Sequence, residues 1–334
     1  MLEYQRHHRP RRTHRLRGRS RLHLGQHVLE HCLGFAGFST RLPGDMRTQR
    51  TDVVILGTAQ DGGIPQLGCN CPHCQAAWTD QSRRRLVASL AIVDHNAKLF
   101  WLVDASPDIV EQVHLLTSSY PEFSLGGILL THAHMGHYLG IAMLGRESWN
   151  HESLPVFCTQ RMGAFLHLNH PWKQLIDLNN IALLIIEPGH PLQLSSAITV
   201  TPILVPHRDE LSDTVAFSIA GPTKRLVYCP DIDRWEGPIL EAIEEADVAL
   251  LDGTFYSGVE LPGRNTSEIP HPCIADSIKV FSEFETQIQF IHFNHSNRLL
   301  SDSNLVEQLA TNGFAISERM DTHTLQATNG GIDD

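Results

Sequence analysis

The stretch T-H-A-H-M-G-H-Y, from Thr131 to Tyr138, is the most informative part of this chain. It places His132, His134 and His137 within six positions, directly after the run G-G-I-L-L. That run predicts a buried strand, because it is apolar and partly β-branched. A strand that ends in a histidine cluster directs several imidazoles at one point beyond the sheet edge. Imidazole is the commonest metal ligand in proteins, so the stretch predicts a metal centre rather than three unrelated histidines.

A second cluster, G-C-N-C-P-H-C, lies upstream and contains Cys69, Cys71 and Cys74. Cysteines at this spacing do not easily pair with each other, whereas three thiolates can close around one tetrahedral zinc at about 2.3 Å. The fourth ligand would be a distant residue, and we expect a histidine. The spacing therefore predicts one structural zinc, with a set of free thiols as the alternative.

The composition is that of an ordinary globular protein. The chain has 334 residues, of which 42% are hydrophobic and 19% charged, which is ample for one large domain. No apolar run reaches the roughly 20 residues of a membrane helix, and there is no secretory pattern. Together with thiols expected to be reduced, this favours the cytoplasm. We expect a small-molecule substrate and no nucleic-acid or membrane partner. A homodimer is compatible with the sequence.

The first 45 residues differ from the rest in composition. Residues 1–21 hold eight arginines and one acid, Glu3, whereas the whole chain carries a net charge of −11. An acidic body argues against a nucleic-acid-binding domain. We predict that residues 1–48 are a basic, disordered extension and that residues 49–334 form the folded domain. A nucleic-acid arm and a targeting segment are the alternatives for the extension.

A chain that starts at Met46 is expected to fold, to bind metal and to keep any activity. The reason is that regular strand patterns begin only at Thr51. Solubility and metal content of the shortened protein measure this. An insoluble or metal-free product would make the extension part of the fold.

Strand and helix patterns alternate at short spacing after Thr51. Strands are expected at 51–57, 89–94, 98–104, 126–130, 154–158, 182–186, 197–205, 214–219, 225–229, 248–252 and 288–293. Helices are expected at 107–116, from about 140, and at 160–168, 238–245 and 273–284. Two groups of strands with helices between them predict two sheets covered by helices, an α/β fold.

Histidines and aspartates follow several of these expected strands. They are His207, Asp231, Asp233, Asp252, His292 and His295. A single Asp after a strand is most often a turn or cap residue, and this applies to Asp233 in particular. Together with the strand before His132, five such strand ends point to one site, because ligands from different strand ends are how a rigid sheet builds a metal centre.

In this order, the residues resemble the metallo-β-lactamase superfamily, a four-layer αβ/βα sandwich. Its usual signature is H-x-H-x-D-H, followed by a His, an Asp and a last His. The resemblance assigns these positions to His132, His134, His137, His207, Asp231 and His292.

Within the superfamily the chain is most similar to the pyrroloquinoline quinone (PQQ) biosynthesis B-protein family. The similarity lies in G-T-A-Q-D-G-G-I-P-Q-L-G-C-N-C-P-H-C, D-G-T-F-Y and I-H-F-N-H-S-N, and it extends over about residues 50–325. The phosphonate-pathway cyclic phosphodiesterases share the C-x-C-x-x-C layout. By resemblance to them, His292 serves the active site and His295 completes the cysteine site. These motifs are specific for the fold but not for the substrate.

One position departs from the signature, because Gly136 stands where the superfamily has Asp. The first metal set, His132, His134 and His207, has three imidazoles and an open position, as in a catalytic zinc site. The second set is expected to be weaker, because glycine supplies no ligand. The change Gly136→Asp is then expected to raise occupancy of the second set, if the backbone there tolerates a side chain.

Three functions fit this ligand set. The first is a metal-dependent hydrolase, with His132, His134, His137 and Asp231 as catalytic residues and a metal-activated water attacking an ester or phosphodiester. The second is a non-haem iron oxygenase in PQQ-type cofactor biosynthesis, because His137, His292 and Asp231 also match the two-His-one-carboxylate arrangement. The third is a non-catalytic, metal-holding carrier. The expected active-site cofactor is one or two ions, zinc first, with iron and manganese as alternatives.

Overall fold

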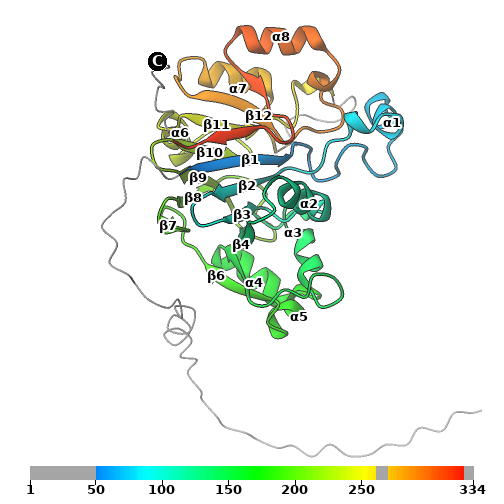
Figure 1. Cartoon of the computed structure of the whole chain (residues 1–334). Helices are drawn as coiled ribbons and strands as arrows, with labels where there is room; N and C mark the ends of the chain where they lie inside the picture. The colour runs from blue at the N-terminus through cyan, green and yellow to red at the C-terminus, as the bar shows by residue number, and fades with distance from the viewer. Residues whose placement is uncertain (1–49, 261–269, 327–334) are drawn as a thin grey trace, which may run out of the picture. The chain divides into compact units, whose positions relative to one another are not determined.

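A computed structural model describes residues 50–260 and 270–326 of the chain (Figure 1). The described residues belong to one compact unit. The predicted extension at residues 1–48 lies outside the described residues.

The described strands form two seven-stranded sheets. The first has the order β14-β1-β2-β3-β4-β5-β6 and the second the order β13-β12-β11-β10-β9-β8-β7. The first comprises β1 (Thr51–Gly57), β2 (Ser89–Asp94), β3 (Leu99–Val103), β4 (Ser124–Leu129), β5 (Leu154–Cys158), β6 (Ile181–Ile185) and β14 (Thr322–Thr324). The second comprises β7 (Leu192–Gln193), β8 (Thr199–Val205), β9 (Thr214–Ala220), β10 (Arg225–Cys229), β11 (Val248–Asp252), β12 (Gln287–Ile291) and β13 (Ala315–Ile316).

Helices cover the outer face of each sheet, so the described part has four layers (Figure 1). Helices of the first sheet's outer core are α2 (Ile109–Ser119), α3 (Met135–Tyr138), α4 (Gln160–Leu168) and α5 (Trp172–Asp177). Helices of the second sheet's outer core are α6 (Pro238–Glu244), α7 (Ile274–Phe281) and α8 (Ser303–Thr311). A further helix, α1 (Pro72–Thr79), follows the cysteines.

Strand β1 shows how the layers arise from sequence. Successive side chains of a strand point to opposite faces of the sheet. Val53 and Ile55 therefore pack between the two sheets, whereas Val54 and Leu56 pack under the outer helices. A strand buried on both faces reads as a continuous apolar run rather than an alternating one.

Parallel pairing determines where the polar strand ends lie. Strand β3 pairs in parallel with β4, and β11 pairs in parallel with both β10 and β12. Parallel neighbours place their carboxyl ends at the same edge of the sheet, so residues that follow these strands come together there.

The predicted α/β sandwich is confirmed, and the longer strands lie within a residue or two of the predicted ranges. The helix expected from about Gly140 begins earlier, as the short helix α3, and continues as a 3₁₀ helix over Leu139–Leu144. Helices α1, α5 and α8 were not predicted. None of the described helices is long and apolar enough to span a membrane.

Candidate metal centre

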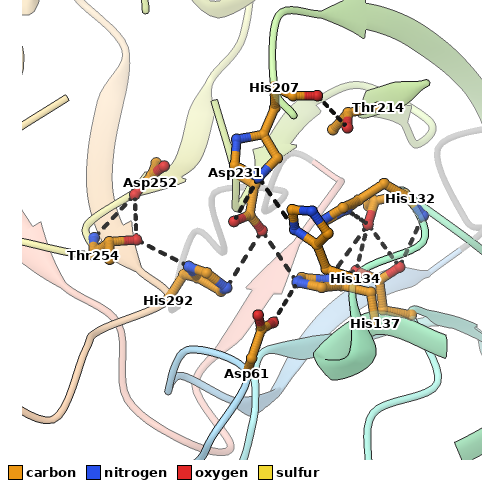
Figure 2. A network of polar contacts seen from close by, with 12 residues as sticks. Asp61, His132, His134, His137, His207, Thr214, Asp231, Asp252, Thr254 and His292 are labelled. Carbon is orange, nitrogen blue, oxygen red and sulfur yellow. Dashed lines mark hydrogen bonds and ion pairs between the residues drawn. The ribbon is translucent and has the colours of Figure 1, made fainter. Parts of the chain in front are cut away.

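The predicted ligands converge at the strand ends of both sheets (Figure 2). His132 lies just beyond β4, and His207 just beyond β8. Asp231 follows β10, and His292 comes directly after β12. Asp231 and these three histidines are almost completely buried, so this part of the site lies below the protein surface.

The first set consists of His132, His134 and His207, whose ligand atoms all lie within 4.8 Å of one another. His134 Nδ1 and His207 Nε2 are 3.3 Å apart. Ligand atoms of a tetrahedral zinc with bonds near 2.1 Å lie roughly 3.4 Å apart, so this spacing suits a shared cation.

The second set consists of His137, Asp231 and His292. Asp231 also faces the first set. Its Oδ2 is 3.2 Å from His137 Nε2 and 3.3 Å from His292 Nε2. Its Oδ1 is 3.6 Å from His207 Nε2. The carboxylate therefore faces imidazoles of both sets, which is the geometry of a bridging ligand.

Asp104 fixes the orientation of His137 from behind. This buried residue follows β3, and its Oδ2 accepts a hydrogen bond of 2.7 Å from His137 Nδ1. Its Oδ1 accepts from the Thr131 amide at 2.8 Å. Asp104 has a φ of +66°. A non-glycine residue in that region costs about 1–3 kcal/mol of conformational free energy, so contacts of the surrounding structure must stabilise this backbone conformation.

Two other histidines are oriented in the same way. His207 Nδ1 donates to Asp233 Oδ1 at 2.9 Å, and His292 Nδ1 donates to Thr254 Oγ1 at 3.0 Å. Thr254 in turn donates to Asp252 at 2.8 Å. A partner on Nδ1 leaves the Nε2 lone pair free for a metal and raises its basicity. Asp233, which was expected to be a turn or cap residue, instead orients a ligand histidine.

Several buried polar atoms at this point lack a hydrogen-bond partner within the described chain. They are Nε2 of His132, His137 and His292, Oδ2 of Asp231, and Oδ1 of Asp61. Each buried group without a partner costs about 1–3 kcal/mol. Divalent cations bound between these residues would satisfy these atoms, so the residues present fit a metal centre.

The protonation states of His132 and His134 favour metal binding at the first set. Burial lowers the pKa of His132 well below its usual range and the pKa of His134 to about 4. Both imidazoles are therefore neutral at pH 7, as metal ligands must be. Burial also lowers the pKa of His137, but Asp104 and Asp231 outweigh it and raise the pKa well above the usual range.

Asp61 is a site residue that the sequence analysis missed. It lies in the loop after β1, and its Oδ1 is 3.3 Å from His137 Nε2. Asp61, His137 and His292 together form a further group with ligand atoms within 4.8 Å. The second set was expected to lack one carboxylate because Gly136 supplies none, and Asp61 places one beside it.

The structure does not meet the condition for the expected gain from Gly136→Asp. A Cβ at Gly136 would lie 2.2 Å from Asp61 Oδ1 and 2.7 Å from Asp61 Cα. Real Cβ atoms do not approach other atoms this closely. A side chain at position 136 has no space while Asp61 is in place.

His271 is the second residue that the sequence analysis missed. Its Nδ1 donates to Asp252 Oδ2 at 2.7 Å, and its ring centroid is 5.2 Å from that of His207. Burial lowers the pKa of His271, but Asp252 outweighs it and raises the pKa to about 9. No regular spacing links this residue to the other histidines, so the sequence did not assign it to the ligand set.

The cysteine cluster comes together with His295, as the resemblance implied. Cys69 Sγ and Cys71 Sγ lie 3.4 and 3.3 Å from His295 Nδ1, and Cys74 completes the group. The amide of Gln66 donates to Cys74 Sγ at 3.3 Å. Amide donors to sulfur stabilise thiolates, and ligands of a zinc–sulfur site lie about 3.6 Å apart, so this cluster also fits zinc.

A cavity of about 570 Å³ opens beside the first set. Its walls include His207 and Asp233, together with Arg161 and Arg208. A small molecule in this cavity would reach the first set and meet two guanidinium groups.

Comparisons with known proteins agree with this geometry. The sequence profile of the beta-lactamase superfamily domain matches residues 100–293. The coenzyme PQQ synthesis protein B of Klebsiella pneumoniae (strain 342) is 29% identical over 311 residues, covering 83% of this chain and 99% of that protein. Its counterpart in Azotobacter vinelandii is 27% identical, covering 79% of this chain and 96% of that protein.

Solved structures share the fold. Zinc-bound PqqB from Methylobacterium extorquens has a TM-score of 0.70 at 24% identity, covering 81% of this chain and 99% of that one. A diphosphatase of the PhnP family has a TM-score of 0.64 at 18% identity, covering 82% and 97%. On the sequence profile and the four-layer fold, the chain belongs to the metallo-β-lactamase superfamily and resembles PQQ synthesis protein B.

Proposed function

We propose that this protein is a zinc-dependent hydrolase that cleaves a small-molecule phosphodiester or ester with two neighbouring ions. The position of Asp231 carries the proposal, because its two oxygens face imidazoles of both ligand sets. Two ions bridged in this way are used by phosphatases and nucleases to hold the attacking and the leaving oxygen of one displacement.

Zinc, when bound, lowers the pKa of a coordinated water to about 7 and polarises the substrate's oxygen. The chain's own residues would hold the ions and orient the ligand side chains. His132, His134 and His207 would hold one ion, and His137, Asp231 and His292 the other. Asp104 and Asp233 keep two of the imidazoles in the required tautomer and orientation.

We propose that His271 donates a proton to the leaving group. Its Nδ1 is fixed by Asp252, and among the described residues no hydrogen bond reaches its Nε2. The raised pKa keeps the imidazolium form populated at neutral pH, as a general acid requires. The nearby zinc charge would lower this pKa from about 9, towards the operating pH.

His271→Ala is expected to slow hydrolysis of a phosphodiester with an alkoxide leaving group by about 10²–10⁴-fold, because that oxygen needs a proton. A p-nitrophenolate leaving group needs no proton, so its release should slow far less. Activity that depends on protonated His271 falls as the pH rises through its pKa, and this alkaline limb should vanish in the variant. His190→Ala, at an exposed histidine, is the control. An equal loss with both leaving groups would contradict the assignment.

Asp61 also bears on the oxygenase alternative. Iron oxygenases use two histidines, one carboxylate and open positions. Here the second set has two carboxylates close to His137, namely Asp61 and Asp231. This favours a two-ion hydrolase. The curated relatives carry the name coenzyme PQQ synthesis protein B, and we propose by analogy that the substrate is a small molecule of cofactor synthesis.

We further propose that Cys69, Cys71, Cys74 and His295 hold one structural zinc. The cysteines lie before and within α1, whereas His295 follows β12 near the end of the described chain. This ion would tie an early loop to the last long strand of the second sheet.

Reconstitution of metal-free protein tests the proposed function. Zinc is expected to restore hydrolysis of bis(p-nitrophenyl) phosphate, measured as released p-nitrophenolate. Retention of two active-site ions without hydrolysis of any phosphodiester or ester would favour the carrier.

A further inference from the structure

Asp61 occupies the space that a side chain at position 136 would need. The 2.2 Å separation between a Cβ at Gly136 and Asp61 Oδ1 means that the two positions compete for one volume. In the superfamily signature that volume belongs to the aspartate of H-x-H-x-D-H. Here a carboxylate reaches the same place from a different segment of the chain (Figure 2).

The loop that carries Asp61 is fixed on both sides. Before it, the Gln60 amide donates to Phe293 O at 2.9 Å, which ties the loop to the residue after His292. After it, Gly63 closes a turn onto Gln60 at 2.8 Å, with a φ of +65° that glycine adopts readily. Ile64 then exchanges two backbone hydrogen bonds with Arg85, of 3.0 and 2.9 Å. The carboxylate is therefore positioned by the backbone beside His292 and His137.

The contacts of Asp61 are those of a ligand rather than of a loop anchor. An anchoring aspartate accepts hydrogen bonds from nearby amides, as Asp104 does from Thr131. Asp61 Oδ1 is buried and has no such partner in the described ranges, yet it lies 3.3 Å from His137 Nε2. Asp231 Oδ2 lies 3.2 Å from the same nitrogen. One N–H cannot donate well to both oxygens, whereas one cation can bind all three atoms.

We propose that Asp61 supplies the carboxylate ligand of the second metal position, in place of the side chain that Gly136 lacks. Gly136 is then required because of Asp61, since any larger residue would push the carboxylate away. The inference rests on the proposed two-ion function and deepens it. The second metal position then has four ligands, namely His137, His292, Asp231 and Asp61. It is therefore not expected to bind metal more weakly than the first.

Metal counting tests this inference without reference to activity. Wild-type protein, loaded with zinc and dialysed, is expected to retain about three ions per chain, one at the cysteines and two at the histidines. Asp61→Ala and Asp61→Asn should each retain about one ion fewer. Asp209→Asn, at an exposed carboxylate near the cavity, is the matched control and should keep the wild-type count.

Gly136→Ala provides a second variant that leaves Asp61 itself unchanged. Its methyl group would lie 2.2 Å from Asp61 Oδ1 and 2.7 Å from Asp61 Cα, so it should displace the loop that carries the carboxylate and lower the count by about one as well. Unchanged melting temperature and cysteine-site zinc would show that these variants fold. Wild-type counts and zinc affinity in both Asp61→Asn and Gly136→Ala would overturn the inference and leave the two-ion function standing. A wild-type count of one active-site ion would instead overturn the two-ion function.

Discussion

His134→Ala is expected to remove most hydrolysis of bis(p-nitrophenyl) phosphate by the zinc-loaded protein. The first set holds three imidazoles, and His134 Nδ1 lies 3.3 Å from His207 Nε2, so its loss leaves two ligands. Changing a residue that merely supports a ligand costs about 10–100-fold in metal affinity or activity. Loss of the ligand itself should therefore cost more than about 100-fold.

The control for this variant is His114→Ala, on the solvent side of α2, which should keep wild-type turnover and zinc. Zinc content of His134→Ala should fall by about one ion per chain, with the cysteine site unaffected. Suppose that activity survives in His134→Ala but is lost in Asp231→Ala and requires ferrous iron and oxygen. The hydrolase account would then be wrong and the oxygenase alternative would replace it.

Cys71→Ser is expected to release about one zinc per chain and to lower the melting temperature. Structural zinc contributes about 10–16 kcal/mol to the folding of zinc-finger peptides. This domain also has large apolar cores, so a loss of a few kcal/mol is expected. At about 2–4 °C per kcal/mol, that corresponds to a decrease of roughly 10 °C.

The matched control is Cys273→Ser, because Cys273 is a half-buried free cysteine outside the cluster. It should keep the zinc count. Calorimetry together with metal analysis measures both variants. Zinc content and melting temperature of Cys71→Ser equal to those of the wild type would refute the structural-zinc proposal.

The sequence predicted those parts of the fold whose information is local. Strands such as β1 and β11 are continuous apolar runs with clear ends, and the histidines at 132, 134 and 137 directly follow one of them. Order along the chain, together with the family resemblance, then brought His207, Asp231 and His292 to the same site. The structure places all six close together.

The residues that were missed depend on tertiary contacts. Asp61 reaches the site because its loop is bonded to Phe293, more than two hundred positions away. His271 is oriented by Asp252 across a connection that includes residues outside the described ranges. Gly136 appeared to be a lost ligand, because nothing in its own segment reveals which atoms fill the neighbouring volume. Sequence patterns identify which residues can bind a metal, whereas the geometry decides which of them share one ion.

Isotope labelling of the product tests the central claim most directly. Metal-free protein is reconstituted with zinc and given bis(p-nitrophenyl) phosphate in ¹⁸O-labelled water without molecular oxygen. The account predicts turnover under these conditions, with one ¹⁸O atom in each p-nitrophenyl phosphate formed. Absence of turnover with zinc, or p-nitrophenyl phosphate that carries no ¹⁸O from the water, would contradict it.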